Sequence, residues 1–246
     1  MKQLLIYARP IVLNRTRDRE LRIKPRIDGY AFARDINSVP LVAGEFAAAA
    51  RHYPIVFAGS DADNLMPAAL LGLHGEQNLF VDADGQWAEH TYIPMFLRRY
   101  PFVVADREDS DEDFSVCIDE SFVDDSDDAV RLFDDAGKDT PVLTQAVRFL
   151  SDYQAGVRAT RTFVQHLVEH KLLIEKTLTV TRSDSDPQTL NGFSVVDEKS
   201  LQNLAQRPLQ KLSKAGSLGL AYVHLMSLGN VQLLSSRLDK QLRVSG

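Results

Sequence analysis

The chain has little of what would place it in a membrane or outside the cell. Its one cysteine, Cys117, excludes an internal disulfide, and 246 residues are enough to bury a core without one. No run of about 18 apolar residues occurs, because polar residues and glycines interrupt the most apolar stretch, 218–234. The apolar start, 1–7, is too short for a signal peptide, and no small-residue cleavage site follows it. These absences predict a soluble, cytoplasmic protein that does not insert into a membrane.

Signatures of catalysis and of cofactor binding are also missing. The 13 glycines stand apart rather than in phosphate-binding loops or dinucleotide fingerprints, and no serine nucleophile elbow occurs. Cys117 lies in the apolar run 114–118, which predicts a buried, inert thiol rather than a nucleophile. We therefore expect no catalytic residue and no cofactor, and the sequence favours a non-enzymatic role.

Two short motifs resemble metal sites, but each has a simpler interpretation. His166, Glu169 and His170 form the H-x-x-E-H pattern of some zinc-protease helices. The residues between them continue the apolar face of a long helix, so we expect both histidines near its exposed C-terminal end, where positive charge is favoured. The sequence Asp-Ala-Asp-Gly at 82–85 begins like a calcium loop but lacks the later acidic ligands, which predicts a turn. We predict no bound metal.

Charge is unevenly distributed along the chain, although the net charge is only −6. Basic residues are in excess between 9 and 34, and acidic residues are in excess between 106 and 139. The basic stretch lacks interleaved aromatic residues and the patterns of zinc or helix-turn-helix binders, so we expect a solvated or mutually paired surface and no nucleic-acid partner. The acidic stretch around 106–128 is the candidate linker, and a protein partner is expected instead.

The N-terminal half predicts short helices that alternate with short strands. A tyrosine-proline pair stands between helix and strand twice, at 53–54 and at 100–101, because the residue before proline leaves the helical region. The expected elements are helices over 46–51 and 93–99, strands over 55–58 and 102–105, and a hairpin or meander of the apolar runs 68–73 and 78–81.

The C-terminal half predicts mainly helices. Thr140 can cap a helix and Pro141 suits its first position, and apolar residues then recur at helical spacing as far as Leu172. The other expected elements are a hairpin of strands 178–181 and 190–195 around a turn at 183–187, and helices over 197–204, 208–212 and 217–234.

These elements predict an α+β fold with two lobes in one compact unit. A mixed lobe of short strands and helices is expected over 1–139, and a helix-dominated lobe with one β-hairpin over 140–246. We expect a single domain, 1–246, in which the stretch around 106–128 is the only candidate linker.

Several motifs of the chain are similar to those of the SapC family of bacterial proteins. The most specific are Pro-Ala-Ala-Leu-Leu-Gly-Leu at 67–73, Asn-Leu-Phe-Val-Asp at 78–82 and Leu-Arg-Arg-Tyr-Pro-Phe at 97–102, and further matches extend over nearly the whole chain. The resemblance implies one family-wide unit but no established reaction. The family name comes from bacterial surface layers, and members tend to be encoded near TonB-dependent receptors and flavin-dependent halogenase-like proteins. It therefore implies an accessory or interaction protein linked to a cell-surface layer or to nutrient uptake.

The alternative is a small-molecule-binding protein or an enzyme of unrecognised type, with a pocket formed by segment 78–102. In such a pocket an arginine fork would bind a carboxylate or sugar acid and an aromatic side chain would stack on a ring. The simpler interpretation is that the same side chains face solvent, pack in the core or end a helix. The candidate ligand-binding residues are Asn78, Asp82, Trp87, Tyr92, Arg98, Arg99 and Tyr100.

Overall fold

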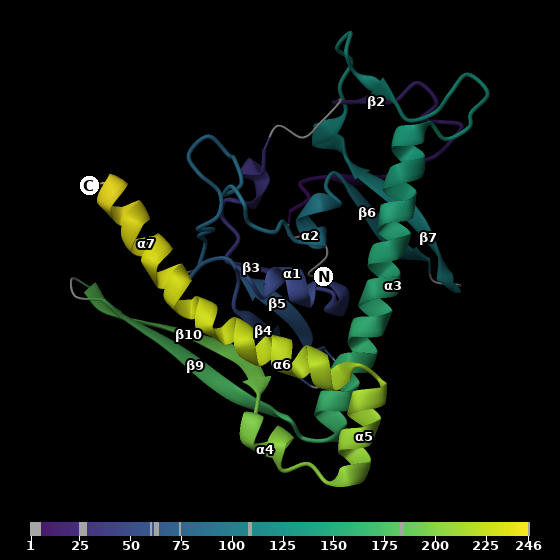
Figure 1. Ribbon diagram of the computed structural model, residues 1–246. Coiled ribbons are helices and arrows are strands. Elements are labelled where there is room, and N and C mark those ends of the chain that lie inside the picture. The colour runs from purple at the N-terminus through teal and green to yellow at the C-terminus, as the bar shows by residue number, and fades with distance from the viewer. Residues whose placement is uncertain are drawn as a thin grey trace. The chain divides into compact units, whose positions relative to one another are not determined.

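The computed structural model describes residues 6–24, 29–59, 61, 64–73, 75–107, 110–182 and 185–245. The chain divides into two compact units, each built from two separate segments. Unit 1 comprises 1–29 and 97–155, and unit 2 comprises 30–96 and 156–246. The units are described one at a time (Figure 1).

Unit 2 contains an antiparallel sheet of five strands in the order β3-β5-β4-β10-β9. Phe57 of β4 lies opposite Ser194 of β10, and this pairing joins strands from the two halves of the chain. The strands are β3 (Ser38–Pro40), β4 (Ile55–Ala58), β5 (Met66–Leu70), β9 (Leu173–Arg182) and β10 (Ser185–Val196).

This sheet overturns the predicted arrangement of the fold. The prediction placed the β9–β10 hairpin in a helix-dominated C-terminal lobe beside a separate mixed lobe. The hairpin instead extends a sheet whose other three strands come from residues 38–70. The fold is mixed α+β with the sheet in the middle and helices at the C-terminal end. Local patterning could not reveal this, because the pairing of β4 with β10 connects residues far apart in sequence.

Helices cover the sheet of unit 2. Helix α6 packs against β4 and β10, and Phe57 of β4 contacts the rings of Phe163 in α3 and His224 in α6, with ring centroids 6.1 and 4.9 Å away. The helices of this unit are η2 (Ala31–Ala33), η3 (Ala43–Glu45), α1 (Phe46–Ala49), α4 (Glu198–Gln202), α5 (Gln206–Lys214), α6 (Ser217–Ser227), η5 (Leu228–Asn230) and α7 (Val231–Ser245).

Unit 1 contains a three-stranded antiparallel sheet in the order β1-β7-β6 and a separate pair of short strands, β2 and β8. The predicted linker is wrong, because most of it forms the β6–β7 hairpin and the short helix after it. The elements are β1 (Pro10–Val12), β2 (Arg22–Ile23), β6 (Phe102–Arg107), β7 (Ser110–Asp119), η4 (Glu120–Phe122) and β8 (Val130–Arg131).

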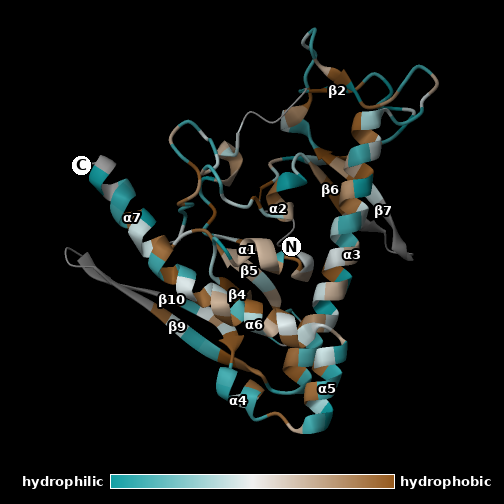
Figure 2. Cartoon of the chain, in the orientation of Figure 1, coloured by the Kyte–Doolittle hydropathy of each residue, from teal (hydrophilic) through white to brown (hydrophobic). Residues whose placement is uncertain are grey.

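The long helix α3 (Pro141–Glu169) confirms the prediction made from its start signals and spacing. Leu143, Leu150, Val157 and Val164 recur every seven residues and are all buried, and apolar and polar residues alternate along the helix (Figure 2). The helix ends three residues earlier than Leu172, because Lys171 takes a left-handed conformation with φ of 53°.

The shorter elements are confirmed with one exception. Strand β4, strand β6, helix α1 and helix α2 (Met95–Arg98) lie where they were expected, as does the β9–β10 hairpin. The predicted hairpin of 68–73 with 78–81 is wrong, because β5 pairs with β3 and β4 and the second run forms no strand beyond a single bridge between Val81 and Trp87. Residues 183 and 184 of the predicted turn lie outside the described residues.

Candidate functional site

The side chain of Asn78 stabilises a loop of unit 2 by hydrogen bonds to its backbone and to that of a second segment. Its side chain is 2% exposed, its Nδ2 donates to the carbonyl of Ala33 at 2.9 Å, and its Oδ1 accepts from the amide of Phe80 at 2.9 Å. Both ends of the amide are therefore used to hold backbone. This geometry gives Asn78 a structural role.

Asp82 and Trp87 shape the turn that follows. The Asp82 carboxylate accepts from the Gln86 amide at 2.8 Å, and Gly85 completes the turn with φ of 79°. Trp87 is buried, and its ring contacts Tyr30 edge-on at 5.4 Å and stacks on Phe80 at 6.0 Å between centroids. The predicted turn at 82–85 is confirmed, and Trp87 belongs to an aromatic core.

Tyr92 meets a buried carboxylate that the sequence prediction did not single out. Glu45 is 3% exposed, and its Oε1 accepts from the Tyr92 hydroxyl at 2.9 Å and from the Met95 amide at 2.6 Å. Its Oε2 accepts from the Val42 amide at 3.0 Å. Backbone and phenol donors thus stabilise a carboxylate in the interior of unit 2.

The other three candidate residues belong to unit 1. Arg98 is exposed, with its guanidinium over the Phe149 ring at 5.5 Å, whereas Arg99 is buried and lies over the Tyr153 ring at 4.9 Å. Tyr100 packs edge-on against Phe122 at 5.6 Å, and burial raises the pKa of its hydroxyl.

The seven candidates therefore fall into two sets. Asn78, Asp82, Trp87 and Tyr92 lie in unit 2, and the other three lie in unit 1. The pocket predicted for segment 78–102 stays a prediction, and the side chains within each unit are engaged in turns, ring contacts and backbone hydrogen bonds.

The H-x-x-E-H motif is engaged in contacts within unit 2. His166 Nδ1 lies 2.8 Å from the hydroxyl of Ser217, and the Glu169 carboxylate pairs with Lys211 at 2.7 Å. Lys211 lowers the pKa of Glu169 through this bond. In the part of the chain that the structure describes, no group of three His, Cys, Asp or Glu side chains is placed to hold a metal ion.

Cys117 of unit 1 is buried, as predicted. It is 5% exposed in β7, and burial raises the pKa of its thiol. A raised pKa keeps the thiol protonated and unreactive.

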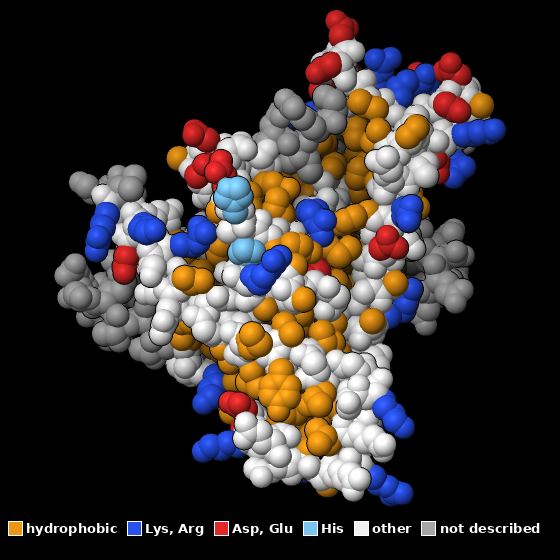
Figure 3. All heavy atoms as spheres, in the orientation of Figure 1, with side chains coloured by type: hydrophobic (Ala, Val, Ile, Leu, Met, Phe, Trp, Pro, Cys, Tyr) orange, Lys and Arg blue, Asp and Glu red, His pale blue; other side chains and the backbone are white. Residues whose placement is uncertain are grey.

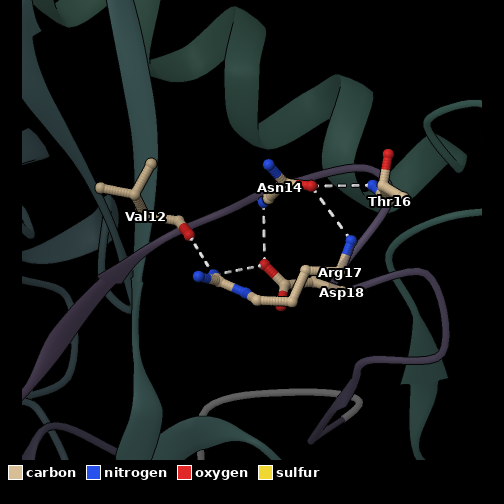
Figure 4. A network of polar contacts seen from close by, with 5 residues as sticks. All are labelled: Val12, Asn14, Thr16, Arg17 and Asp18. Carbon is tan, nitrogen blue, oxygen red and sulfur yellow. Dashed lines mark hydrogen bonds and ion pairs between the residues drawn. The ribbon is translucent and has the colours of Figure 1, made fainter.

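The basic and acidic stretches of unit 1 pair with each other. This mutually paired surface is one of the two alternatives that the sequence predicted. Arg9 bonds to Glu120, and Arg15 pairs with Asp139 at 3.1 Å. Charge also pairs locally, because Arg17 donates to the carboxylate of Asp18 at 2.7 Å and lowers its pKa (Figure 4). The three arginines are exposed, so solvent screens these pairs and each contributes little to stability, although Asp18 itself is buried.

His224 is an ionisable side chain buried in the core of unit 2. It is fully buried, and its Nε2 accepts from the Val196 amide at 3.0 Å. Burial lowers its pKa to about 4, and hydrogen bonding to the Ile55 backbone offsets only part of this effect. Ser227 fixes the same contact between helix and sheet, because its hydroxyl accepts from the Ile55 amide at 3.0 Å. The ring is therefore neutral at pH 7 and serves as an acceptor.

An uncharged helical face runs along α6, η5 and α7. The backbone stays helical through η5, so the three elements follow one another as one continuous, bent rod (Figure 1). None of residues 215–236 is charged. We call five exposed residues of this rod, which recur at spacings of three and four, the helical seam: Gly219, Tyr222, Met226, Gly229 and Leu233.

The helical seam exposes large apolar side chains. Met226 is 78% exposed, Leu233 is 52% exposed and Tyr222 is 41% exposed. Figure 3 shows hydrophobic side chains gathered over α6. At Gly219 and Gly229 an added Cβ would meet nothing within 4 Å, so a side chain at either position would extend into open space. The sequence prediction treated 217–234 as a helix with a buried apolar face and missed this second face, although the uncharged run 215–236 was a readable signal.

An open pocket of about 370 Å³ lies elsewhere in unit 2. Residues of the sheet and of η5 and α7 line it, and they were not among the sequence candidates. The apolar lining includes Val56, Leu70, Phe193, Val195, Leu228 and Val231.

Comparison with known proteins gives one result. The model of the SapC family matches residues 13–234, which is nearly the whole chain. No match was found among curated proteins or among solved structures. In the described residues, no helix is long and apolar enough to cross a membrane.

Proposed function

Because this chain belongs to the SapC family, we propose that it is a non-enzymatic interaction protein that docks a partner on its helical seam. We further propose that it acts in the cytoplasm as an accessory to a bacterial cell-surface layer or nutrient-uptake system. The observation that carries the docking proposal is the exposure of Tyr222, Met226 and Leu233 within a stretch, 215–236, that has no charged residue.

The composition of the helical seam supports binding to protein. Charged residues are depleted in the cores of protein interfaces, whereas tyrosine and methionine are enriched there. A helix that is apolar on all sides is normally buried, yet α6 buries one face on the sheet and exposes the other. A partner that covers this face would remove the exposed Met226 side chain from water.

The spacing of the helical seam indicates what kind of partner fits. Steps of three and four residues are those of a helix that packs along another helix. Gly219 and Gly229 carry no side chain and face open space, so they would let the backbone or a large side chain of the partner approach closely. We therefore propose that the partner presents an apolar helical stripe.

Site-specific crosslinking in the cells that make the protein tests this proposal. A photo-reactive amino acid replaces Met226 in one variant and Gln202, an exposed residue of α4, in a control variant. We expect a discrete crosslinked product from position 226 and none from position 202. A further Gly229→Leu change places a large side chain at an open position of the helical seam and should abolish the product without unfolding the chain.

Two results would count against the proposal. Equal crosslinking from positions 226 and 202 would mean that contacts at the helical seam are nonspecific. A product that survives Gly229→Leu would mean that the partner does not approach the helix closely at Gly229. The mass of the product also separates a second copy of the chain from a different protein.

A further inference from the structure

The pocket of unit 2 is formed by one face of the sheet, which carries Val56, Phe193 and Val195, and by the helical rod. Lys176 of β9 and Phe193 of β10 are cross-strand partners, so their side chains share a face of the sheet. Leu178 and Val195 lie two residues further along each strand and share that face as well. All four line the pocket, and Leu228 and Val231 come from the helical rod.

The interior of the pocket is apolar and suited to a small molecule. A volume of about 370 Å³ lies at the lower end of the range for small-molecule sites. Val56, Leu70 and Val195 are at most 6% exposed, so the deep part of the lining is apolar and sheltered from bulk water. An apolar chain that enters would remove this surface from water, which is favourable in proportion to the area covered.

The polar groups of the lining lie where the pocket meets solvent. Lys176, Thr177 and Gln232 are all exposed. Among the described lining residues, Lys176 alone is charged. Its neighbour Glu175 alternates to the other face of the strand, so the charge at this edge is positive. An ammonium group with the neutral hydrogen-bonding side chain of Gln232 suits an anionic headgroup.

We propose that this pocket binds a free amphiphile with one apolar chain and one anionic headgroup, as in a long-chain carboxylate. The chain occupies the space between Val56, Phe193 and Val231, and the headgroup lies at Lys176. This inference goes beyond partner docking and does not depend on it. The pocket and the helical seam share one residue, Gly229, and otherwise use different residues.

Calorimetric titration of the full chain with matched probes tests the proposal. The probes are dodecanoate and dodecyltrimethylammonium, which share an alkyl chain and differ in charge, and vesicles of anionic phospholipid. We expect dodecanoate to bind one site. Lys176→Gln should weaken the binding of dodecanoate about fivefold, because an exposed charge contact contributes modestly to affinity. The same change should leave the binding of dodecyltrimethylammonium unaffected. The matched control is Lys199→Gln, at an exposed position of α4, which should change the affinity for neither dodecanoate nor dodecyltrimethylammonium.

Filling the pocket should abolish binding. Val195→Phe places extra volume inside the pocket, and Gln232→Phe does so from an exposed helix position that cannot disrupt the core. Loss of dodecanoate binding in either folded variant supports the proposal. It is overturned if dodecanoate does not bind, if Gln232→Phe binds as tightly as the wild type, or if Lys176→Gln binds dodecanoate unchanged. Binding of vesicles without binding of dodecanoate would also overturn it.

Discussion

Acidification from pH 7 to pH 5 will destabilise unit 2 through the buried imidazole of His224. The ring is fully buried, and its pKa is lowered from 6.5 to about 4. In the unfolded chain the ring regains its usual pKa, so between these two values the unfolded state binds a proton that the folded state does not. Stability therefore falls as the pH drops through this window and is restored as the pH rises.

The size of this effect follows from the shift. A lowering from 6.5 to about 4 corresponds to about 3 kcal/mol at the acid end of the window, at 1.36 kcal/mol per pKa unit. About 2 kcal/mol of this loss occurs between pH 7 and pH 5, where the unfolded ring becomes protonated and the folded ring stays neutral.

Urea unfolding of the wild type and of His224→Gln at both pH values measures the effect. The single tryptophan, Trp87, belongs to the same unit, so its fluorescence follows the relevant transition. Glutamine keeps an acceptor for the Val196 amide and cannot titrate, so the wild type should lose about 2 kcal/mol more than the variant on acidification. His52→Gln is the comparison variant, because burial also lowers the pKa of the half-buried His52. On acidification the wild type should lose more stability than His52→Gln, by a smaller margin than it does against His224→Gln. If wild type and His224→Gln respond equally to pH, the reasoning is refuted.

Two matched pairs of substitutions test the packing of unit 2 by urea unfolding. Gly219→Ala should stabilise the chain by about 1 kcal/mol, because its Cβ meets nothing within 4 Å and alanine favours the helix. Gly156→Ala should destabilise it by about 1–3 kcal/mol, because its Cβ would lie 3.1 Å from a methyl group of Val42; equal effects of the two changes would contradict this packing. Asn78→Ala should cost about 2–3 kcal/mol, because it leaves buried backbone groups without partners. Asp82→Ala at an exposed turn should cost less than about 1 kcal/mol, and the reverse order would refute the role given to Asn78.

Sequence reasoning succeeded where the signal was local. The Thr140-Pro141 start of α3 and the turn before Gln86 are set by neighbouring residues, and both were predicted correctly. It failed where partners are distant in sequence, as for β4 with β10 and for Asn78 with the carbonyl of Ala33. The apolar run that contains Phe80 looked like a strand, but it packs against Trp87 and Tyr53 as part of an aromatic core.

The candidate sites were harder to predict than the elements. The sequence candidates were chosen by their chemistry. In the structure, many of them stabilise turns by hydrogen bonds or pack against aromatic rings. Lys176 and Phe193 become neighbours only when β9 and β10 pair, so no local pattern marks the pocket. The helical seam was within reach of the sequence, because an uncharged stretch as long as 215–236 stands out in a chain in which 25% of residues are charged.

Oxidation of Met226 tests the docking proposal most directly. Exposed methionine thioethers oxidise readily, and Met226 is 78% exposed. Mild peroxide treatment of the purified chain and of the cells that make it, followed by mass spectrometry, compares Met226 with the partly exposed Met66 of β5 as an internal reference. A partner on the helical seam predicts that Met226 oxidation falls several-fold relative to Met66 in cells. An unchanged ratio of Met226 to Met66 oxidation would contradict the proposed docking surface.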